Sequence, residues 1–336
     1  MSIPAFSDIA KLSNDLLNKD FYHTSAATLE VKSTTANGVA FKVNGKSTQE
    51  KTTTGALETK YTDKPSGITP KRSPYKPPLN KNYIRPSIAA RVFNKQTSPN
   101  CHIIFQSGLA LLLIVHRRAG LTVTQTWNTA NALESKIELN DNIAKGLKAE
   151  VLGNFFPSTQ AKGVKLNLHF KQPNFHTRAF FDLLKGPTAN LDAVIGHDGF
   201  LVGAEAGYDV QKAAVTKYSL GVGYQQPLYT ASIIASNNLS VFSASYYHKV
   251  NSQVEAGAKA IWDSKSGSNV GLEVASKYRI DPLSFTKAKI NDRGIAAVSY
   301  NVLLREGVTL GLGASFDTQK LDSSPNKIGA SFTFEA

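Results

Sequence analysis

The stretch Val308-Thr-Leu-Gly-Leu-Gly-Ala-Ser-Phe316 places an apolar side chain at every second residue. Successive side chains of a β-strand point to opposite faces, so this alternation predicts a strand with one apolar and one polar face. The same pattern recurs over residues 164–170, 272–280 and 328–334. Gly, Asn, Asp, Ser and Pro residues separate such segments and predict turns. The sequence therefore predicts an all-β fold.

Alternating strands occur in soluble sandwiches and small barrels as well as in transmembrane barrels. The polar faces here carry charged side chains such as Glu273, Lys277 and Arg279. No segment reaches the roughly 18 apolar residues of a membrane helix, and the longest apolar run covers residues 103–115. A barrel needs no such run, because strands of about ten residues turn apolar side chains to lipid and polar ones to a watery lumen. Since closure also pairs every backbone amide, we predict an all-β transmembrane barrel.

The overall charge of the chain favours anionic partners. Its 336 residues include 38 Lys or Arg and 25 Asp or Glu, which gives a net charge of +13. Such a charge suits nucleic acid, acidic lipid or phosphorylated metabolites. The single cysteine excludes an intrachain disulfide framework and a cysteine-rich zinc module.

One segment, residues 65–118, differs in composition from the rest. It holds nine Lys or Arg residues, no Asp or Glu, seven of the 14 prolines and Cys101. Such a composition disfavours a packed core. We predict that this segment is a 54-residue basic, Pro-rich insert, either disordered or the product of a retained intron or a gene-model error. The alternative is a genuine basic loop that binds nucleic acid or anionic lipid.

The first 20 residues have helical rather than strand periodicity. Apolar residues recur at helical spacing, with charged residues on or near the opposite side: Phe6, Ile9, Ala10, Leu16 and Leu17 against Asp8, Lys11, Asp15 and Lys19. This spacing predicts an amphipathic helix over residues 1–20, ahead of a barrel made from residues 21–64 and 119–336. The helix could lie on the lumen wall, on the membrane surface, or as a cap on a soluble barrel.

Four stretches carry a resemblance to a known family. They are residues 4–11 (PAFSDIAK) with 14–23, residues 121–128 (LTVTQTWN) followed by Gly146-Leu-Lys148, the segment from Tyr278-Arg-Ile-Asp-Pro282 to Tyr300, and residues 327–334 (KIGASFTF). Together they resemble the mitochondrial outer-membrane porins, the voltage-dependent anion channels, and they are most similar to fungal members. The resemblance covers residues 1–64 and 119–336 and leaves out the predicted insert.

The resemblance implies the 19-stranded barrel already known for this family, with the N-terminal helix inside the pore. It implies a voltage-gated, weakly anion-selective channel of the mitochondrial outer membrane that passes ATP, ADP, phosphate, other metabolites and small ions. It implies neither an enzyme nor a cofactor or metal site. The expected partners are anionic metabolites, membrane lipid or sterol, and the outer-membrane assembly machinery. A homo-oligomer is a further possibility, and no nucleic acid is expected to bind.

Two other functions compete with this one. A protein-translocating barrel of the same superfamily would have a longer N-terminal extension and would lack the segment from Tyr278 to Tyr300. A non-conducting binding protein would use the basic segment 65–118. No Ser/His/Asp arrangement and no phosphate-binding loop supports an enzyme, because Gly221-Val-Gly223 and Gly311-Leu-Gly313 lie inside strand patterns without a following helix.

The candidate site residues are the charges on the helix and on the polar strand faces. We expect Asp15 and Lys19, on the predicted helix, to take part in gating and nucleotide contact. Cations on the polar register are expected to line the anion pathway, together with Lys19: Lys46, Lys60, Lys148, Lys277, Arg279, Lys287 and Lys289. Lumen cations lower the barrier for anions. The alternative for each lysine is an interfacial cation that meets no substrate.

Two further predictions concern the outer face and the last strand. Gln125 shares a face with Leu121, Val123 and Trp127, so it should point to lipid, where several animal relatives have a glutamate that takes part in regulation. A polar residue tolerated near the membrane interface is an equal alternative. The resemblance assigns a β-signal for the assembly machinery to the last strand: Lys327, Gly329, Phe332 and Phe334.

Overall fold

The computed structural model describes residues 2–50, 52–62, 121–141, 144–184, 186, 188–265, 267, 270–319 and 327–336. Nearly all of them belong to one compact unit, Met1–Thr62 with Thr122–Ala336. The predicted insert over residues 65–118 lies outside the described residues, and the predictions made for it stay predictions.

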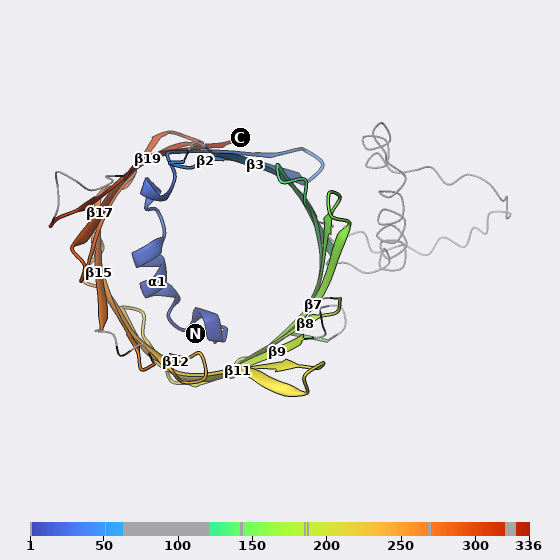
Figure 1. Cartoon of the computed structure of the whole chain (residues 1–336). Helices are drawn as coiled ribbons and strands as arrows, with labels where there is room; N and C mark the ends of the chain where they lie inside the picture. Colours follow the sequence, from blue (N-terminus) through green and yellow to red (C-terminus); the bar gives the residue numbers. More distant parts are fainter. Residues whose placement is uncertain are drawn as a thin grey trace, which may run out of the picture. The chain divides into compact units, whose positions relative to one another are not determined.

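Nineteen strands within the described residues form one closed sheet (Figure 1). Consecutive strands are hydrogen-bonded neighbours, and the parallel pair β1–β19 closes the ring. An odd number of alternating strands leaves the first and the last pointing the same way, which is why this pair is parallel. The strands are β1 (Ala27–Thr34), β2 (Val39–Ser47), β3 (Thr53–Thr62), β4 (Leu121–Asn128), β5 (Leu133–Asn140), β6 (Leu147–Phe156), β7 (Ala161–Lys171), β8 (Phe175–Asp182), β9 (Thr188–His197), β10 (Phe200–Asp209), β11 (Ala214–Gln225), β12 (Tyr229–Ser236), β13 (Val241–Lys249), β14 (Val254–Asp263), β15 (Gly271–Asp281), β16 (Ser284–Asn291), β17 (Ile295–Arg305), β18 (Val308–Asp317) and β19 (Lys327–Glu335). The predicted 19-stranded barrel is confirmed.

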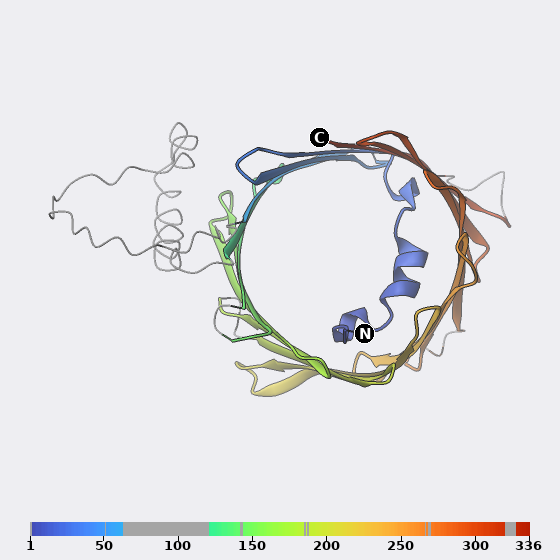
Figure 2. The same ribbon diagram turned by 180° about the vertical axis from the view of Figure 1, so that it is seen from behind.

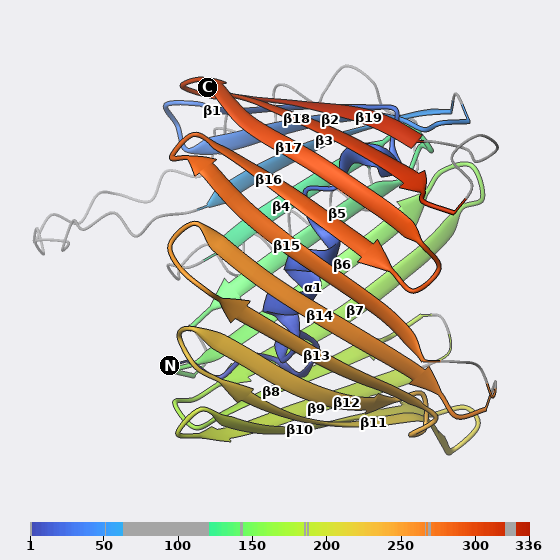
Figure 3. The same cartoon turned by 90° about the vertical axis from the view of Figure 1, so that its left-hand side faces the viewer.

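The outer face of the barrel is apolar and exposed. Leu191 on β9 and Ile233 on β12 expose 52% and 56% of their surface. Leu312, from the stretch that predicted the fold, is also exposed and points outward. Such a surface would be unfavourable in water but matches the lipid-facing band of a transmembrane barrel. The strands run obliquely across the barrel wall, as transmembrane strands do (Figure 3).

No helix among the described residues is both long enough and apolar enough to cross a bilayer.

The N-terminal segment lies inside the ring of strands, in contact with the wall (Figures 1 and 2). Its helical pattern is split into a 3-10 turn η1 (Phe6–Asp8), a helix α1 (Lys11–Asn18) and a second 3-10 turn η2 (Tyr22–Thr24). The prediction of a helix inside the pore is confirmed, but the prediction of one helix over residues 1–20 is wrong.

The break in the helix allows apolar side chains to reach two separate parts of the curved wall. Before the break, Phe6 and Ile9 pack with Val194 and Leu201 of β9 and β10. After it, Leu16 and Leu17 pack with Tyr247 of β13 and Ala275 of β15. Ala10, at the junction, has φ −96° and ψ 19°, outside the helical values. Burial of apolar side chains against the barrel therefore stabilises the segment more than an uninterrupted short helix would.

The two faces of β9 predict different effects of an introduced charge on the free energy of unfolding. Leu191→Arg places a cation in hydrocarbon near the middle of the strand, and we expect it to lower the free energy of unfolding by about 2–4 kcal/mol. Asn190→Arg is the matched control, because residue 190 faces the lumen beside Asp192, and it should change the value by no more than about 0.5 kcal/mol. Denaturant unfolding in lipid vesicles measures both. Equal losses would contradict the assignment of the faces.

Candidate functional site: the lumen and its N-terminal segment

The inner face of the barrel is polar and accessible to water. Lys42, Lys148 and Lys217 point inward, yet their side chains are 39%, 38% and 48% exposed. A small barrel filled by its own side chains would bury them, whereas barrels with sixteen or more strands enclose an aqueous channel. The interior is therefore a solvated lumen rather than a packed core.

Glycines on the inner face lie beneath the N-terminal segment. A Cβ atom added to Gly223 of β11 would stand 2.8 Å from Ile9 Cγ2, and one added to Gly203 of β10 would stand 2.8 Å from Phe6 Cδ2. Added Cβ atoms would also meet the segment at Gly196, Gly221, Gly257, Gly311, Gly313 and Gly329. We call these eight positions the glycine seat. Without it the N-terminal segment could not approach the wall so closely.

The sequence analysis missed the glycine seat, although a signal for it was present. The pairs Gly221/Gly223 and Gly311/Gly313 stand at every second residue, on the face where a lumen-lining strand ordinarily carries polar side chains. Glycines that are restricted to the inner face indicate that another segment of the chain packs closely against that face. The same packing accounts for Gly329 of the predicted β-signal, which lies under the backbone oxygens of Tyr22 and Ser25.

Two predicted pathway lysines contact the helix. Lys287 Nζ donates to the carbonyl oxygens of Asp15 at 3.1 Å and Lys19 at 2.8 Å, and Lys289 Nζ donates to the carbonyl oxygen of Leu17 at 3.0 Å. Both lysines lie on the polar face of β16, as predicted. Their ammonium groups are directed at the C-terminal end of α1.

The two predicted gating residues form an ion pair with each other. Lys19 Nζ donates to Asp15 Oδ2 at 2.7 Å, across one turn of helix. The hydrogen bond to Asp15 raises the pKa of Lys19. Both side chains remain accessible to water in the lumen. The N-terminal segment thus presents a cation and an anion to the pore.

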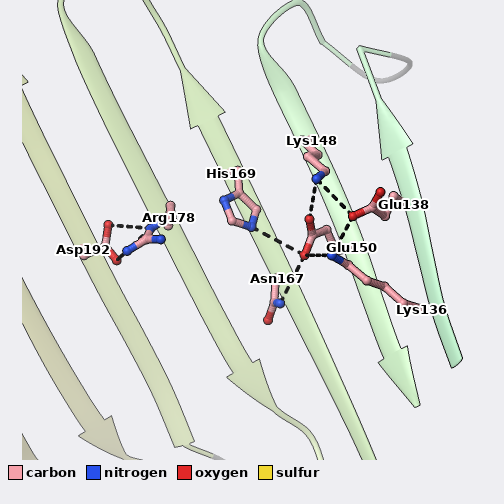
Figure 4. Close-up of polar contacts among 8 residues, drawn as sticks. All are labelled: Lys136, Glu138, Lys148, Glu150, Asn167, His169, Arg178 and Asp192. Atoms are coloured by element: carbon pink, nitrogen blue, oxygen red, sulfur yellow. Dashed lines mark hydrogen bonds and ion pairs between the residues drawn. The ribbon is translucent and has the colours of Figure 1, made fainter. Parts of the chain in front are cut away.

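Lys148 belongs to a charge network on β5, β6 and β7 (Figure 4). Its Nζ is 2.6 Å from a Glu150 oxygen and 3.1 Å from Glu138 Oε1. Lys136 Nζ lies 2.6 Å from Glu138 Oε1 and 3.3 Å from Glu150 Oε2. The network is completed by His169 Nε2, 3.7 Å from Glu150 Oε2. Two ammonium groups therefore face two carboxylates, and the charge of Lys148 is compensated.

A further ion pair lies on the wall and contacts the N-terminal segment through a hydrogen bond. Arg178 of β8 binds both carboxylate oxygens of Asp192 on β9, with Nη2 to Oδ2 at 2.7 Å (Figure 4). The same Nη2 donates to Ser7 Oγ at 3.1 Å. Paired contacts of this kind fix the orientation of a guanidinium group. The sequence analysis did not single out Arg178.

The remaining predicted cations are uncompensated. Lys46, Lys60, Lys277 and Arg279 occupy the lumen register, and among the described residues none has a carboxylate partner within 4.0 Å. The Nζ of Lys277 lies 4.5 Å from the ring centre of Phe285. These four positions leave positive charge open to the lumen.

The outward-facing predictions agree with the strand register. Gln125 pairs with Thr59 on β3, on the face that carries Trp127, so it points to lipid. On β19, Phe332 and Phe334 are exposed on the outer face. The regulatory role of position 125 and the assembly role of β19 stay predictions.

A closed sheet with a lipid-facing band and a solvated lumen defines a transmembrane β-barrel pore. The model of the family described as eukaryotic porin matches residues 2–71 and 105–329, and the chain belongs to this family. The predicted resemblance to mitochondrial porins is confirmed.

Three fungal proteins are similar to the chain over the whole length of both partners. The Mitochondrial outer membrane protein porin of Neurospora crassa is 62% identical, covering 100% of each chain. The protein of the same name from Candida albicans is 44% identical, again over 100% of each. The Non-selective voltage-gated ion channel 1 of Saccharomyces cerevisiae is 34% identical over 100% of each.

The glycine seat predicts how the segment responds to a larger side chain. We expect Gly223→Val to displace Ile9 and to increase the mobility of a spin label attached at residue 11 in a K11C/C101S background. The control is Gly163→Val, because residue 163 also faces the lumen and its added Cβ would meet only Asn154, at 3.9 Å. Electron paramagnetic resonance in lipid vesicles measures the mobility. Equal spectra for the two variants would contradict the seat.

His23, in η2, predicts a pH dependence. Burial lowers its pKa, and the ammonium groups of Lys289 and Lys327 add to the shift. As the pH falls below about 6.5, the unfolded state therefore takes up a proton at His23 before the folded state does. The contribution of neutral His23 to the free energy of unfolding is present above that pH, and it is lost as the pH falls towards the lower folded-state pKa. We expect His23→Gln to flatten the loss of unfolding free energy between pH 7.5 and 5.5. An unchanged slope would argue against this role.

Proposed function

We propose that the chain is a voltage-gated, weakly anion-selective channel of the mitochondrial outer membrane that passes ATP, ADP, phosphate, other small metabolites and small ions. The observation that carries this proposal is the solvated lumen, in which inward-facing lysines of a closed transmembrane barrel remain about 40% exposed. The names of the fungal relatives support the membrane and the voltage gating. The eukaryotic porins are channels, and we propose no catalytic activity for this member.

The anion preference would come from the uncompensated cations. Lys46, Lys60, Lys277 and Arg279 face the lumen without a nearby carboxylate in the described part of the chain, whereas the network around Lys148 is balanced. Fixed positive charge lowers the entry barrier for phosphate groups and raises it for cations. Because salt screens charges beyond about 8 Å at physiological ionic strength, the preference in a wide lumen should be weak.

The voltage response would come from charges that can change position in the field. Moving one elementary charge across 100 mV is worth about 2.3 kcal/mol. Asp15 and Lys19 lie on a segment that is packed against the wall but is not part of the sheet. We therefore keep both as candidates for gating, and Lys19 for contact with nucleotide phosphates.

The partners other than metabolites would bind the outer face of the barrel or its last strand. Lipid or sterol would cover the apolar band, and Gln125 would meet it without a charge, so regulation by a membrane-facing glutamate is not expected here. The assembly machinery would recognise β19 through Lys327, Gly329, Phe332 and Phe334. A second copy could pack against the same outer face.

Planar-bilayer recordings of the full chain test the channel. We expect conductance that falls at high voltage of either sign, and a reversal potential in a KCl gradient that indicates anion preference. K46Q/K60Q removes two uncompensated cations and should move the reversal potential towards the cation side. K148Q/E150Q removes a balanced pair and should leave it unchanged. Absence of voltage-dependent conductance would overturn the proposed function.

A further inference from the structure

Lys287 is a buried lysine in an otherwise solvated lumen. It is 2% exposed. A buried ammonium group is unfavourable unless polar partners replace its hydration. Lys287 finds them in the N-terminal segment, at the carbonyl oxygens of Asp15 and Lys19 and, 3.8 Å away, at the carboxylate of Asp20. An anion in the pore could reach this group only after the segment moved away.

The carbonyl groups that Lys287 and Lys289 contact belong to the end of α1. The last carbonyls of a helix mostly lack a partner within it, and the helix dipole places partial negative charge there. The Asp15 carbonyl also accepts the backbone N–H of Lys19 at 3.1 Å. Helix α1 has no basic residue in its own last turn. The wall supplies that charge instead, through Lys289 to Leu17 and Lys287 to Asp15 and Lys19.

The residues that follow the helix are held at the same place. The ring of Phe21 lies 5.1 Å from Lys287 Nζ and 4.9 Å from Lys289 Nζ, within the range of cation–π attraction. Tyr22 then donates its hydroxyl to Asn301 Oδ1 at 2.6 Å. The sequence from the end of α1 into η2 is thus fixed to β16 and β17 by several polar contacts in a row.

From this geometry we infer that Lys287 and Lys289 are positioning residues: they hold the C-terminal end of α1 on β16 rather than contacting permeating anions. Their positive charge is shared between the helix carbonyls and the Phe21 ring on one side and, on the other, the carboxylates of Asp20 for Lys287 and of Glu273 for Lys289, the latter at 2.8 Å. The inference rests on the proposed channel for its electrical readout alone, because the position of the helix can be measured without current.

Lys277 provides a matched control. It stands opposite Lys287 in the β15–β16 register and faces the same lumen, but its Nζ contacts the ring of Phe285 instead of the helix. Lys277→Met and Lys287→Met each remove one positive charge from neighbouring positions. K277M should therefore alter ion selectivity more than K287M, because Lys277 is open to the lumen and Lys287 is buried, and only K287M should alter the position of α1.

The experiment measures the distance between spin labels at residues 11 and 124, in a K11C/T124C/C101S background reconstituted in lipid. Residue 11 lies on α1, and Thr124 faces the lumen on β4. We expect one narrow distance distribution in the parent and in K277M, a broadened one in K287M, and a distribution close to the parent in K287R. A narrow distribution in K287M would overturn the inference, and so would equal broadening in K277M.

A second variant and a second readout keep the test decisive. If K287M fails to fold, K289M, which removes the contacts to Leu17 and the Phe21 ring and the ion pair with Glu273, should give a smaller broadening, and its absence would overturn the inference. In bilayers, K287M should shift the voltage of half-closure, whereas K277M should change only the reversal potential. Normal gating with unchanged distances would refute the positioning role alone. Absent gating with the expected distances would refute the proposed function alone.

Discussion

The structure depends on the pairing of every backbone amide where no water is available. In hydrocarbon an unpaired strand edge is too costly to persist, so the sheet must close on itself. With nineteen alternating strands, closure requires a parallel pair, and the register between β1 and β19 runs from Ala27↔Ala330 to Lys32↔Glu335. Two further backbone bonds extend the seam, from Ala330 N to Ala26 O and from Ala336 N to Lys32 O. The N-terminal segment enters the lumen beside this seam, above Gly329.

Closure also separates the tasks of the two faces. The outer face must be apolar, which leaves little room for variation in chemistry. The inner face contacts water and the N-terminal segment, and it differs around the barrel. Beneath the segment it has glycines that permit close approach and two lysines that bind the helix end. Away from the segment it has charges that bind each other, as around Glu150. The segment is therefore matched to one part of the wall.

The fold could be predicted from the sequence because its two periodicities are local. Period two assigned Lys60 and Lys148 to the lumen and Gln125 to the lipid, and helical spacing identified the apolar face of the N-terminal segment. What lies over a given lumen residue could not be predicted, because alternation identifies a face but not its neighbours. The contact from Lys287 to Asp15 spans 272 positions in the chain. The break at Ala10 could not be predicted for the same reason. It depends on the contacts of the segment with two patches of the wall, which belong to strands far from it in the sequence.

The lumen cations are therefore not equivalent, although the sequence presents them alike. Lys148 lies between two carboxylates, Lys287 is buried against helix carbonyls, and Lys46 is exposed without an ion pair to any described residue. Only cations of the last kind keep their full effect on a passing anion, so the net charge of the chain overstates the field in the pore. This matters for transport, because conduction requires that an anion be attracted and then released. Pairing half of the eight predicted pathway cations lets a basic barrel favour phosphate compounds without retaining them.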